Sequence, residues 1–140
     1  DHDTVLLHVS ESLAAKCLDG SSPAFYARKG YGSGIDKWLV YFEGDGWCYD
    51  AEQCYLRSKS DMGGSKGLHP HRIVPWFMNS DGSMNPPFYN WNTIHVPYCD
   101  GSSFSGNAKF SFQVCQLYIV FDVCTFTSYI YFNLEGNHSH

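Results

Sequence analysis

The stretch KWLVYFEGDGWCYDAEQC, residues 37–54, runs from an apolar segment into a glycine-rich corner and then into a short loop bounded by two cysteines. Its first part, Lys37 to Gly44, is an apolar, β-branched and aromatic run, which is typical of a strand. A continuous apolar run suits a strand that is buried on both faces, as in a parallel sheet. This stretch therefore predicts an α/β fold and places a backbone-exposing corner where a strand ends.

A second strand is predicted over NTIHVPYCDGSS, residues 92–103, and it too reaches a glycine-bearing corner, at residues 99–101. Two central strands that each end in such a corner are the layout of an open α/β sheet with a site outside the strand ends. Residues 4–16 predict a strand or a short helix, because they mix both periodicities. Residues 17–30 predict an early hairpin, and residues 55–87 are rich in loops.

The composition limits the classes of protein to consider. The chain has 140 residues, of which 44% are hydrophobic and 16% are charged, which suits one domain with a core. Its formal charge of -5 argues against nucleic-acid binding, which needs a basic face. Its six cysteines are even in number and lack zinc-like spacing, so they predict disulfides and an oxidising compartment rather than a metal site. The acidic first residues do not match a signal peptide, so the chain is either a mature or partial sequence or one that stays inside the cell.

The last third of the chain is more apolar than the rest. Residues 110–134 carry a single charge, Asp122, and their length permits a membrane-spanning helix. Asp122 would cost about 2.5–3.5 kcal/mol near the centre of such a helix, and no Lys or Arg follows to set its orientation. Aromatic and β-branched residues predict strands there instead, and a membrane-tethered form remains an alternative.

The glycine corner after the first strand has a possible chemical use. A Gly-x-Gly segment leaves successive backbone N–H groups free to point one way, and such groups bind an anion or a developing negative charge. In ester hydrolysis the charge develops on the carbonyl oxygen, and each donor aimed at it is worth about 3–4 kcal/mol. The alternative is an ordinary β-turn beside a disulfide.

Five stretches together carry a resemblance to a known family. They are CLDGSSPAFY (17–26), KWLVYFEGDGWCYDAEQC (37–54), GGSKG (63–67), NPPFYNWN (85–92) and VPYCDGSSFSG (96–106). Their order and spacing resemble those of the plant pectin acetylesterases, and the animal Notum carboxylesterases are similar but more distant. The resemblance covers about residues 5 to 107.

The resemblance implies a secreted serine esterase that removes acetyl groups from pectin, such as acetylated homogalacturonan, in the cell wall. It implies no cofactor, no metal, no nucleic acid and no membrane. The expected fold is the N-terminal part of an α/β-hydrolase with an open, mostly parallel sheet. Residues 1–107 would form this part of the domain, and residues 108–140 would be an unrelated hydrophobic tail.

The resemblance also assigns site residues. The backbone N–H groups of Asp45 and Gly46 would be the oxyanion donors, and Trp47 would line the substrate site. The family usually has glycine where Asp45 stands. Aspartate tolerates a left-handed backbone less well than glycine, and its carboxylate would oppose a developing negative charge. The implied disulfides are Cys17–Cys99 and Cys48–Cys54, which leaves Cys115 and Cys124 without an assigned partner.

A serine esterase also needs a nucleophile on a sharp strand-to-helix turn, a histidine base and an acid. The Gly-x-Ser-x-Gly match is GGSKG around Ser65, but polar residues precede it and Pro70 opposes a following helix. Glu43 and Asp45 are too close in sequence to be argued as a glycosidase pair. Ser102, Ser103 and Ser105 follow the second strand, but DGSSFSG lacks the small residue on each side that lets an elbow turn tightly. His95 is expected to be a packed histidine within that strand, and His69 and His71 to be solvated loop residues.

The sequence therefore predicts the front part of an esterase, truncated and without its own nucleophile. Such a chain would expose a strand edge and apolar faces, which predicts poor stability. A second hypothesis is a secreted carbohydrate-binding or decoy protein that keeps aromatic loops, such as Trp47, Tyr89 and Trp91, without chemistry.

Overall fold

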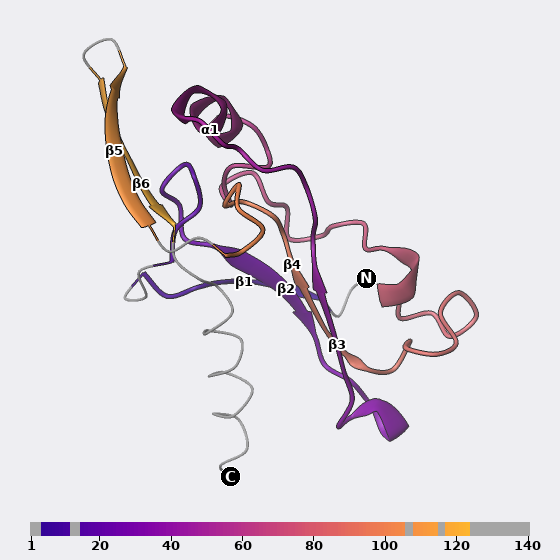
Figure 1. Ribbon diagram of the computed structural model, residues 1–140. Helices are drawn as coiled ribbons and strands as arrows, with labels where there is room; N and C mark the ends of the chain where they lie inside the picture. Colours follow the sequence, from indigo (N-terminus) through magenta and orange to yellow (C-terminus); the bar gives the residue numbers. More distant parts are fainter. Residues whose placement is uncertain (1–3, 12–14, 106–107, 115–116, 124–140) are drawn as a thin grey trace. The chain divides into compact units, whose positions relative to one another are not determined.

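The computed structural model describes residues 4–11, 15–105, 108–114 and 117–123 (Figure 1). The chain divides into two compact units, and each is described by itself. The sheet unit comprises Asp1–His8, Ala24–Glu43 and Gly67–Pro97. The corner unit comprises Val9–Pro23, Gly44–Lys66 and Tyr98–His140.

The sheet unit is built on four strands in the order β1-β2-β4-β3. The strands are β1 (Val5–His8), β2 (Ala24–Arg28), β3 (Trp38–Phe42) and β4 (Asn92–Val96). β3 runs parallel to β4, whereas β1 with β2 and β2 with β4 are antiparallel. The open α/β sheet is confirmed, and within these strands it is mixed rather than mostly parallel. A parallel pair needs a long crossover, and residues 43–91 between β3 and β4 provide it.

Burial in the sheet differs from the prediction made for the first strand. All five residues of β4 are buried, so β4 is the strand covered on both faces. β3 alternates instead, and Trp38, Val40 and Phe42 are 36–46% exposed. The prediction that β3 is buried on both faces is therefore wrong for the described residues. The physical reason is its place in the order: β3 is an edge strand, with β4 as its neighbour on one side.

One buried side chain sets the start of the parallel pair. Asn92 is 7% exposed, and its Oδ1 accepts a hydrogen bond from the backbone N–H of Gly30 at 2.8 Å. Its Nδ2 donates to the carbonyl oxygens of Ile35 and Lys37 at 2.7 and 2.9 Å. These bonds tie the turn before β3, which includes the short 3-10 helix Gly32–Gly34, to the first residue of β4. A second 3-10 helix, Trp76–Met78, lies between β3 and β4 in the chain.

The corner unit contains a helix that was not predicted, α1 (Ala51–Ser58). The side chain of Asp50 caps it by accepting from the backbone N–H of Gln53 at 2.8 Å. The Gln53 amide donates back to the same carboxylate at 2.9 Å. An acidic residue followed three positions later by Gln is a helix-start signal, and it was available in the sequence.

The apolar segment near the C-terminus forms strands where it is described. β5 (Ala108–Val114) and β6 (Leu117–Val123) pair antiparallel, with Phe110 opposite Phe121. The prediction of strands is confirmed for this part of residues 110–134. In the part of the chain that the structure describes, no helix has the length and apolar character needed to cross a membrane. Cys115 and Cys124 lie outside the described residues.

Candidate functional site

The backbone of the predicted oxyanion corner is held from a second segment of the corner unit. The carbonyl oxygen of Gly46 accepts a hydrogen bond from the Tyr98 hydroxyl at 3.3 Å. The backbone N–H of Cys48 donates to the carbonyl oxygen of Gly101 at 3.0 Å. Tyr98 is 1% exposed, so its ring is a fixed support. These two hydrogen bonds hold the backbone at Gly46 and at Cys48, on either side of Trp47.

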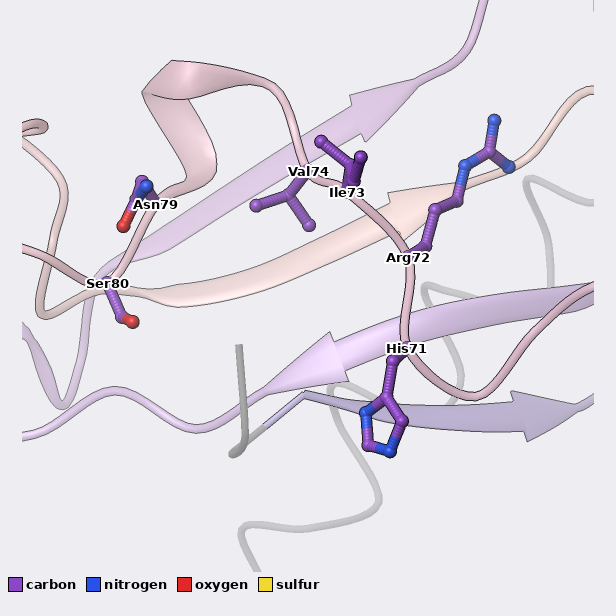
Figure 2. A pocket seen from close by; sticks show the side chains of 6 residues that line it. All are labelled: His71, Arg72, Ile73, Val74, Asn79 and Ser80. Carbon is purple, nitrogen blue, oxygen red and sulfur yellow. The ribbon is translucent and has the colours of Figure 1, made fainter.

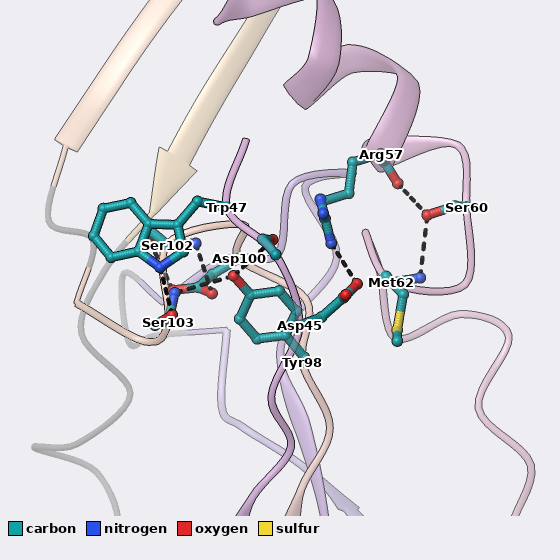
Figure 3. A network of polar contacts seen from close by, with 10 residues as sticks. Asp45, Trp47, Arg57, Ser60, Met62, Tyr98, Asp100, Ser102 and Ser103 are labelled. Carbon is teal, nitrogen blue, oxygen red and sulfur yellow. Dashed lines mark hydrogen bonds and ion pairs between the residues drawn. The ribbon is translucent and has the colours of Figure 1, made fainter. Parts of the chain in front are cut away.

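The side chains of the corner leave the backbone in opposite directions (Figure 3). The Asp45 carboxylate accepts a hydrogen bond from Arg57 Nη1 at 2.7 Å. The Trp47 indole donates from Nε1 to the Ser103 hydroxyl at 2.6 Å and remains 58% exposed. Each of the four successive residues 45–48 is therefore held by a contact of its own. Such preorganisation is what a charge-stabilising site requires.

Two disulfides brace the corner unit, and both pairings implied by the resemblance are present in the structure. Cys48–Cys54 joins the corner to α1, and Cys17–Cys99 joins residues 82 positions apart. Gly101 lies against the first bridge with φ at +67°. A side chain there would bring its Cβ to 2.6 Å from Cys48 Sγ, so glycine is required on both counts.

The supporting segment after Tyr98 is a tight, hydrogen-bonded turn. The Asp100 carboxylate accepts from the backbone N–H and the hydroxyl of Ser102 at 3.2 and 2.9 Å. Ser103 has φ at +53°, and its N–H donates to the Tyr98 hydroxyl at 3.1 Å. The Ser105 hydroxyl donates to the carbonyl oxygen of Ser102 at 2.6 Å. These serines hold the turn that supports the corner, in agreement with the prediction that they are not an elbow nucleophile.

Asp45 departs from its predicted behaviour in two ways. It is not among the described residues with positive φ, so the expected strain of a left-handed aspartate is absent. The pKa of its carboxyl lies below the ordinary value because the backbone N–H of Gly46 donates to it and because Arg57 pairs with it. Its negative charge is therefore balanced by Arg57 rather than left facing the corner. The N–H of Gly46, one of the two predicted donor amides, lies near this carboxylate and contributes to lowering its pKa.

Arg57, like Tyr98, is a residue of this site that the sequence-based argument missed. It lies in the last turn of α1 and its side chain is 18% exposed. Its guanidinium lies over the Tyr98 ring, 5.8 Å from the ring centroid. Cys54 and Arg57 are three positions apart and so share a face of the helix. Because Cys54 is bonded to Cys48, that face is turned toward the corner, and the helix-start signal at Asp50 could have revealed this.

A cavity of about 310 Å³ lies beside the ion pair. This volume is at the lower end of the range for small-ligand pockets. Polar and apolar groups both line it, among them Asp45, Gln53, Leu56, Arg57, Ser60 and Met62. Its floor near Ser60 is fixed, since that hydroxyl donates to the carbonyl oxygen of Arg57 at 2.8 Å.

Ser65 is a buried structural residue of the corner unit. It is 5% exposed, and its hydroxyl donates to the carbonyl oxygen of Ser22 at 2.6 Å. Its backbone N–H donates to the Ser21 hydroxyl at 2.9 Å. Neither a strand nor a helix adjoins it, so the strand-to-helix elbow is absent at this position. The GGSKG segment is a packed turn, as predicted.

The candidate histidines belong to the sheet unit. His95 is 2% exposed in β4, between the rings of Tyr26 and Tyr41. Its two ring nitrogens have no hydrogen-bond partner among the described residues, and burial lowers its pKa. It is a packed histidine, as predicted. His69 lies in a loop, where its carbonyl oxygen accepts from the Tyr26 hydroxyl at 2.7 Å.

A second cavity, of about 420 Å³, lies in the sheet unit (Figure 2). His71, Arg72, Ile73, Val74, Asn79 and Ser80 line it. Arg72 forms an ion pair with Glu43 at 2.6 Å. Glu43 and Asp45 therefore each have an arginine of their own, and this arrangement gives no support to a pair of glycosidase carboxylates.

The open sheet, followed after β3 by a braced glycine corner, is that of the N-terminal part of an α/β-hydrolase fold, and comparisons agree. The structure is similar to that of the Wnt deacylase Notum from Drosophila, with a TM-score of 0.66 and 29% identity over 75% of this chain and 30% of that one. A family model for pectinacetylesterase matches residues 1–121. The chain belongs to the pectinacetylesterase family.

Two relatives show how much of the family fold the chain includes. Pectin acetylesterase 7 from Arabidopsis thaliana is 47% identical over 95 residues, which is 68% of this chain and 24% of the relative. The chain thus spans about a quarter of the length of that relative. An "inactive palmitoleoyl-protein carboxylesterase notum1b" from Danio rerio is 29% identical over 103 residues, which is 72% of this chain and 73% of the relative. The division at residue 107 into a domain part and a tail stays a prediction.

Proposed function

We propose that this chain supplies the oxyanion-binding side of a carboxylic ester hydrolase that removes acetyl groups from pectin. The observation that carries the proposal is the corner at residues 45–48, where each residue is held by a separate contact. The family resemblance supports acetylated homogalacturonan or a similar polysaccharide as the substrate. Two disulfides and this substrate support a place outside the cell, in the cell wall.

The corner would act at the step where the nucleophile adds to the acetyl carbonyl. The carbonyl oxygen becomes negative in the tetrahedral intermediate, and the N–H groups of Asp45 and Gly46 would donate to it. Each such donor, fixed in advance, contributes about 3–4 kcal/mol to stabilising the transition state. The Tyr98 and Gly101 contacts support this role, because they prevent the corner from reorganising during the reaction.

The proposal places the nucleophile of the reaction outside the serines considered above. The hydroxyl groups of Ser65, Ser102 and Ser105 donate to backbone or carboxylate oxygens nearby, and that of Ser103 accepts from Trp47. In this proposal the described residues bind and stabilise the oxyanion, and they do not attack the ester.

A second candidate function is binding of pectin without chemistry. The short Danio rerio relative that is described as inactive favours it, because the chain covers most of that relative. The exposed Trp47 ring, fixed at Nε1, would be a platform for a sugar ring. Pectin that co-sediments with the chain without losing acetate would support this function.

The proposed function is tested with a chimera. The 95 matching residues of Arabidopsis pectin acetylesterase 7 are replaced by those of this chain, and acetate release from acetylated pectin is measured. We expect the chimera to release acetate, and the chain alone to release none that depends on Ser65, as a Ser65→Ala variant would show. A folded chimera without activity would contradict the proposal that this corner binds an oxyanion.

A further inference from the structure

Arg57 has the features of an anion-binding residue. Its Nη1 donates to Asp45, while the remaining guanidinium donors have no other hydrogen-bond partner among the described residues. Its Nη2 lies beside the corner, since a Cβ built on Gly46 would be 3.6 Å from it. The guanidinium is held by Tyr98, and it borders the cavity of about 310 Å³. A planar group held in this way binds a carboxylate through two parallel hydrogen bonds.

The present occupant of this position is Asp45 of the same chain. Its carboxylate takes one hydrogen bond from Arg57 and lies within reach of the Gly46 N–H. The guanidinium that holds Asp45 is the donor that would hold a carboxylate arriving from solution. The Asp45 side chain is 38% exposed, so it can be displaced without opening a packed core.

We propose that Arg57 forms a binding site for the carboxylate of a uronic acid residue beside the corner, and that Asp45 occupies this site as a built-in competitor. An intramolecular carboxylate on a short tether acts at an effective concentration of at least about the millimolar range. It also repels a second carboxylate, because like charges at one site are unfavourable. Asp45 would therefore weaken the binding of a uronate carboxylate at Arg57, and its loss would strengthen that binding. The choice of a uronic acid as the ligand rests on the proposed function.

An ordinary surface ion pair makes a different prediction. Removing either partner of such a pair has similar and small effects on stability, and it leaves ligand binding unchanged. If Asp45 is a built-in competitor, removing Asp45 and removing Arg57 must have opposite effects on the binding of a carboxylate. Removing Asp45 strengthens the binding of a carboxylate, whereas removing Arg57 abolishes it.

The test is isothermal titration of the full chain with a galacturonate trisaccharide, and with a neutral galactose trisaccharide as the control ligand. We expect Asp45→Gly and Asp45→Asn to bind the acidic trisaccharide about tenfold more tightly than the unchanged chain. Adding Arg57→Gln to Asp45→Gly should remove this gain. Asp81→Asn is the matched control for charge, because the Asp81 carboxylate accepts from Ser83 in a separate turn.

Equal affinity of the Asp45 variants and the unchanged chain would overturn the inference, and so would an equal gain for the neutral trisaccharide or for Asp81→Asn. Circular dichroism and a count of free thiols establish that each variant is folded with its disulfides. A chimera that releases acetate, together with Asp45 variants that do not bind, would refute this inference and leave the proposed function standing. An inactive chimera, together with tight binding of the acidic trisaccharide by the Asp45 variants, would refute the proposed function and support this inference.

Discussion

Removal of the long-range disulfide should destabilise the chain about twice as much as removal of the short-range one. Cys17 and Cys99 are separated by 82 positions, and Cys48 and Cys54 by 6. In the chain-entropy model these separations correspond to about 4.5 and about 2.2 kcal/mol of unfolding free energy. Replacement of each pair by alanine should therefore lower stability by amounts in that ratio.

Urea unfolding of the chain and the two double variants, without reductant, measures this difference. At a slope of about 2 kcal/mol per molar urea, the midpoint should fall by about 2 M for Cys17→Ala/Cys99→Ala and by about 1 M for Cys48→Ala/Cys54→Ala. If the unmodified chain is only marginally stable, Cys17→Ala/Cys99→Ala should show no urea transition at all, whereas Cys48→Ala/Cys54→Ala should still show one. This outcome also agrees with the prediction. An equal loss in both variants, or a larger loss in the second, would refute the loop-closure argument.

Three further predictions concern buried or fixed side chains. Burial lowers the pKa of His95 in the folded chain, so below about pH 6.5 the unfolded state binds a proton that the folded state does not. Stability should then fall as the pH drops through this range, and thermal melts of His95→Phe should show a weaker fall; an unchanged slope would contradict this cause. Asn92→Ala should cost about 2–4 kcal/mol in urea unfolding, because it removes three hydrogen bonds made by a buried side chain. Ser103→Ala should cost under about 1 kcal/mol but speed hydrogen exchange at the Trp47 indole, measured by NMR, and unchanged exchange would show that the bond does not fix the ring.

Local sequence patterns predicted the central strands but not which strands lie beside them. β3 and β4 were found because each is an apolar run ended by turn residues, which is a local property. The edge position of β3 depends on the strand order, and an apolar run does not encode which strand lies beside it. The helix α1 was missed because the segment between Cys48 and Cys54 was expected to be a loop, although Asp50 and Gln53 carry the start signal.

The corner itself was predicted, and its supports were not. The glycine pattern and the resemblance pointed to Asp45, Gly46 and Trp47, because these are consecutive in sequence. Tyr98 and Arg57 hold them from other segments, through contacts that spacing along the chain does not reveal. The sequence-based argument expected the Asp45 carboxylate to oppose a developing negative charge at the corner. The structure pairs this carboxylate with Arg57, which balances its charge.

The claim that the corner amides stabilise an oxyanion is tested most directly by removing one amide and keeping its surroundings. Gly46→Pro removes the N–H, whereas Gly46→Ala keeps it, since the added Cβ would have Arg57 Nη2 as its nearest neighbour at 3.6 Å. The measurement is kcat for acetate release by the chimera carrying each change. We predict a fall of about 10²–10³-fold for Gly46→Pro and little change for Gly46→Ala. Equal values of kcat for the two variants would contradict the assignment of these amides to the developing charge.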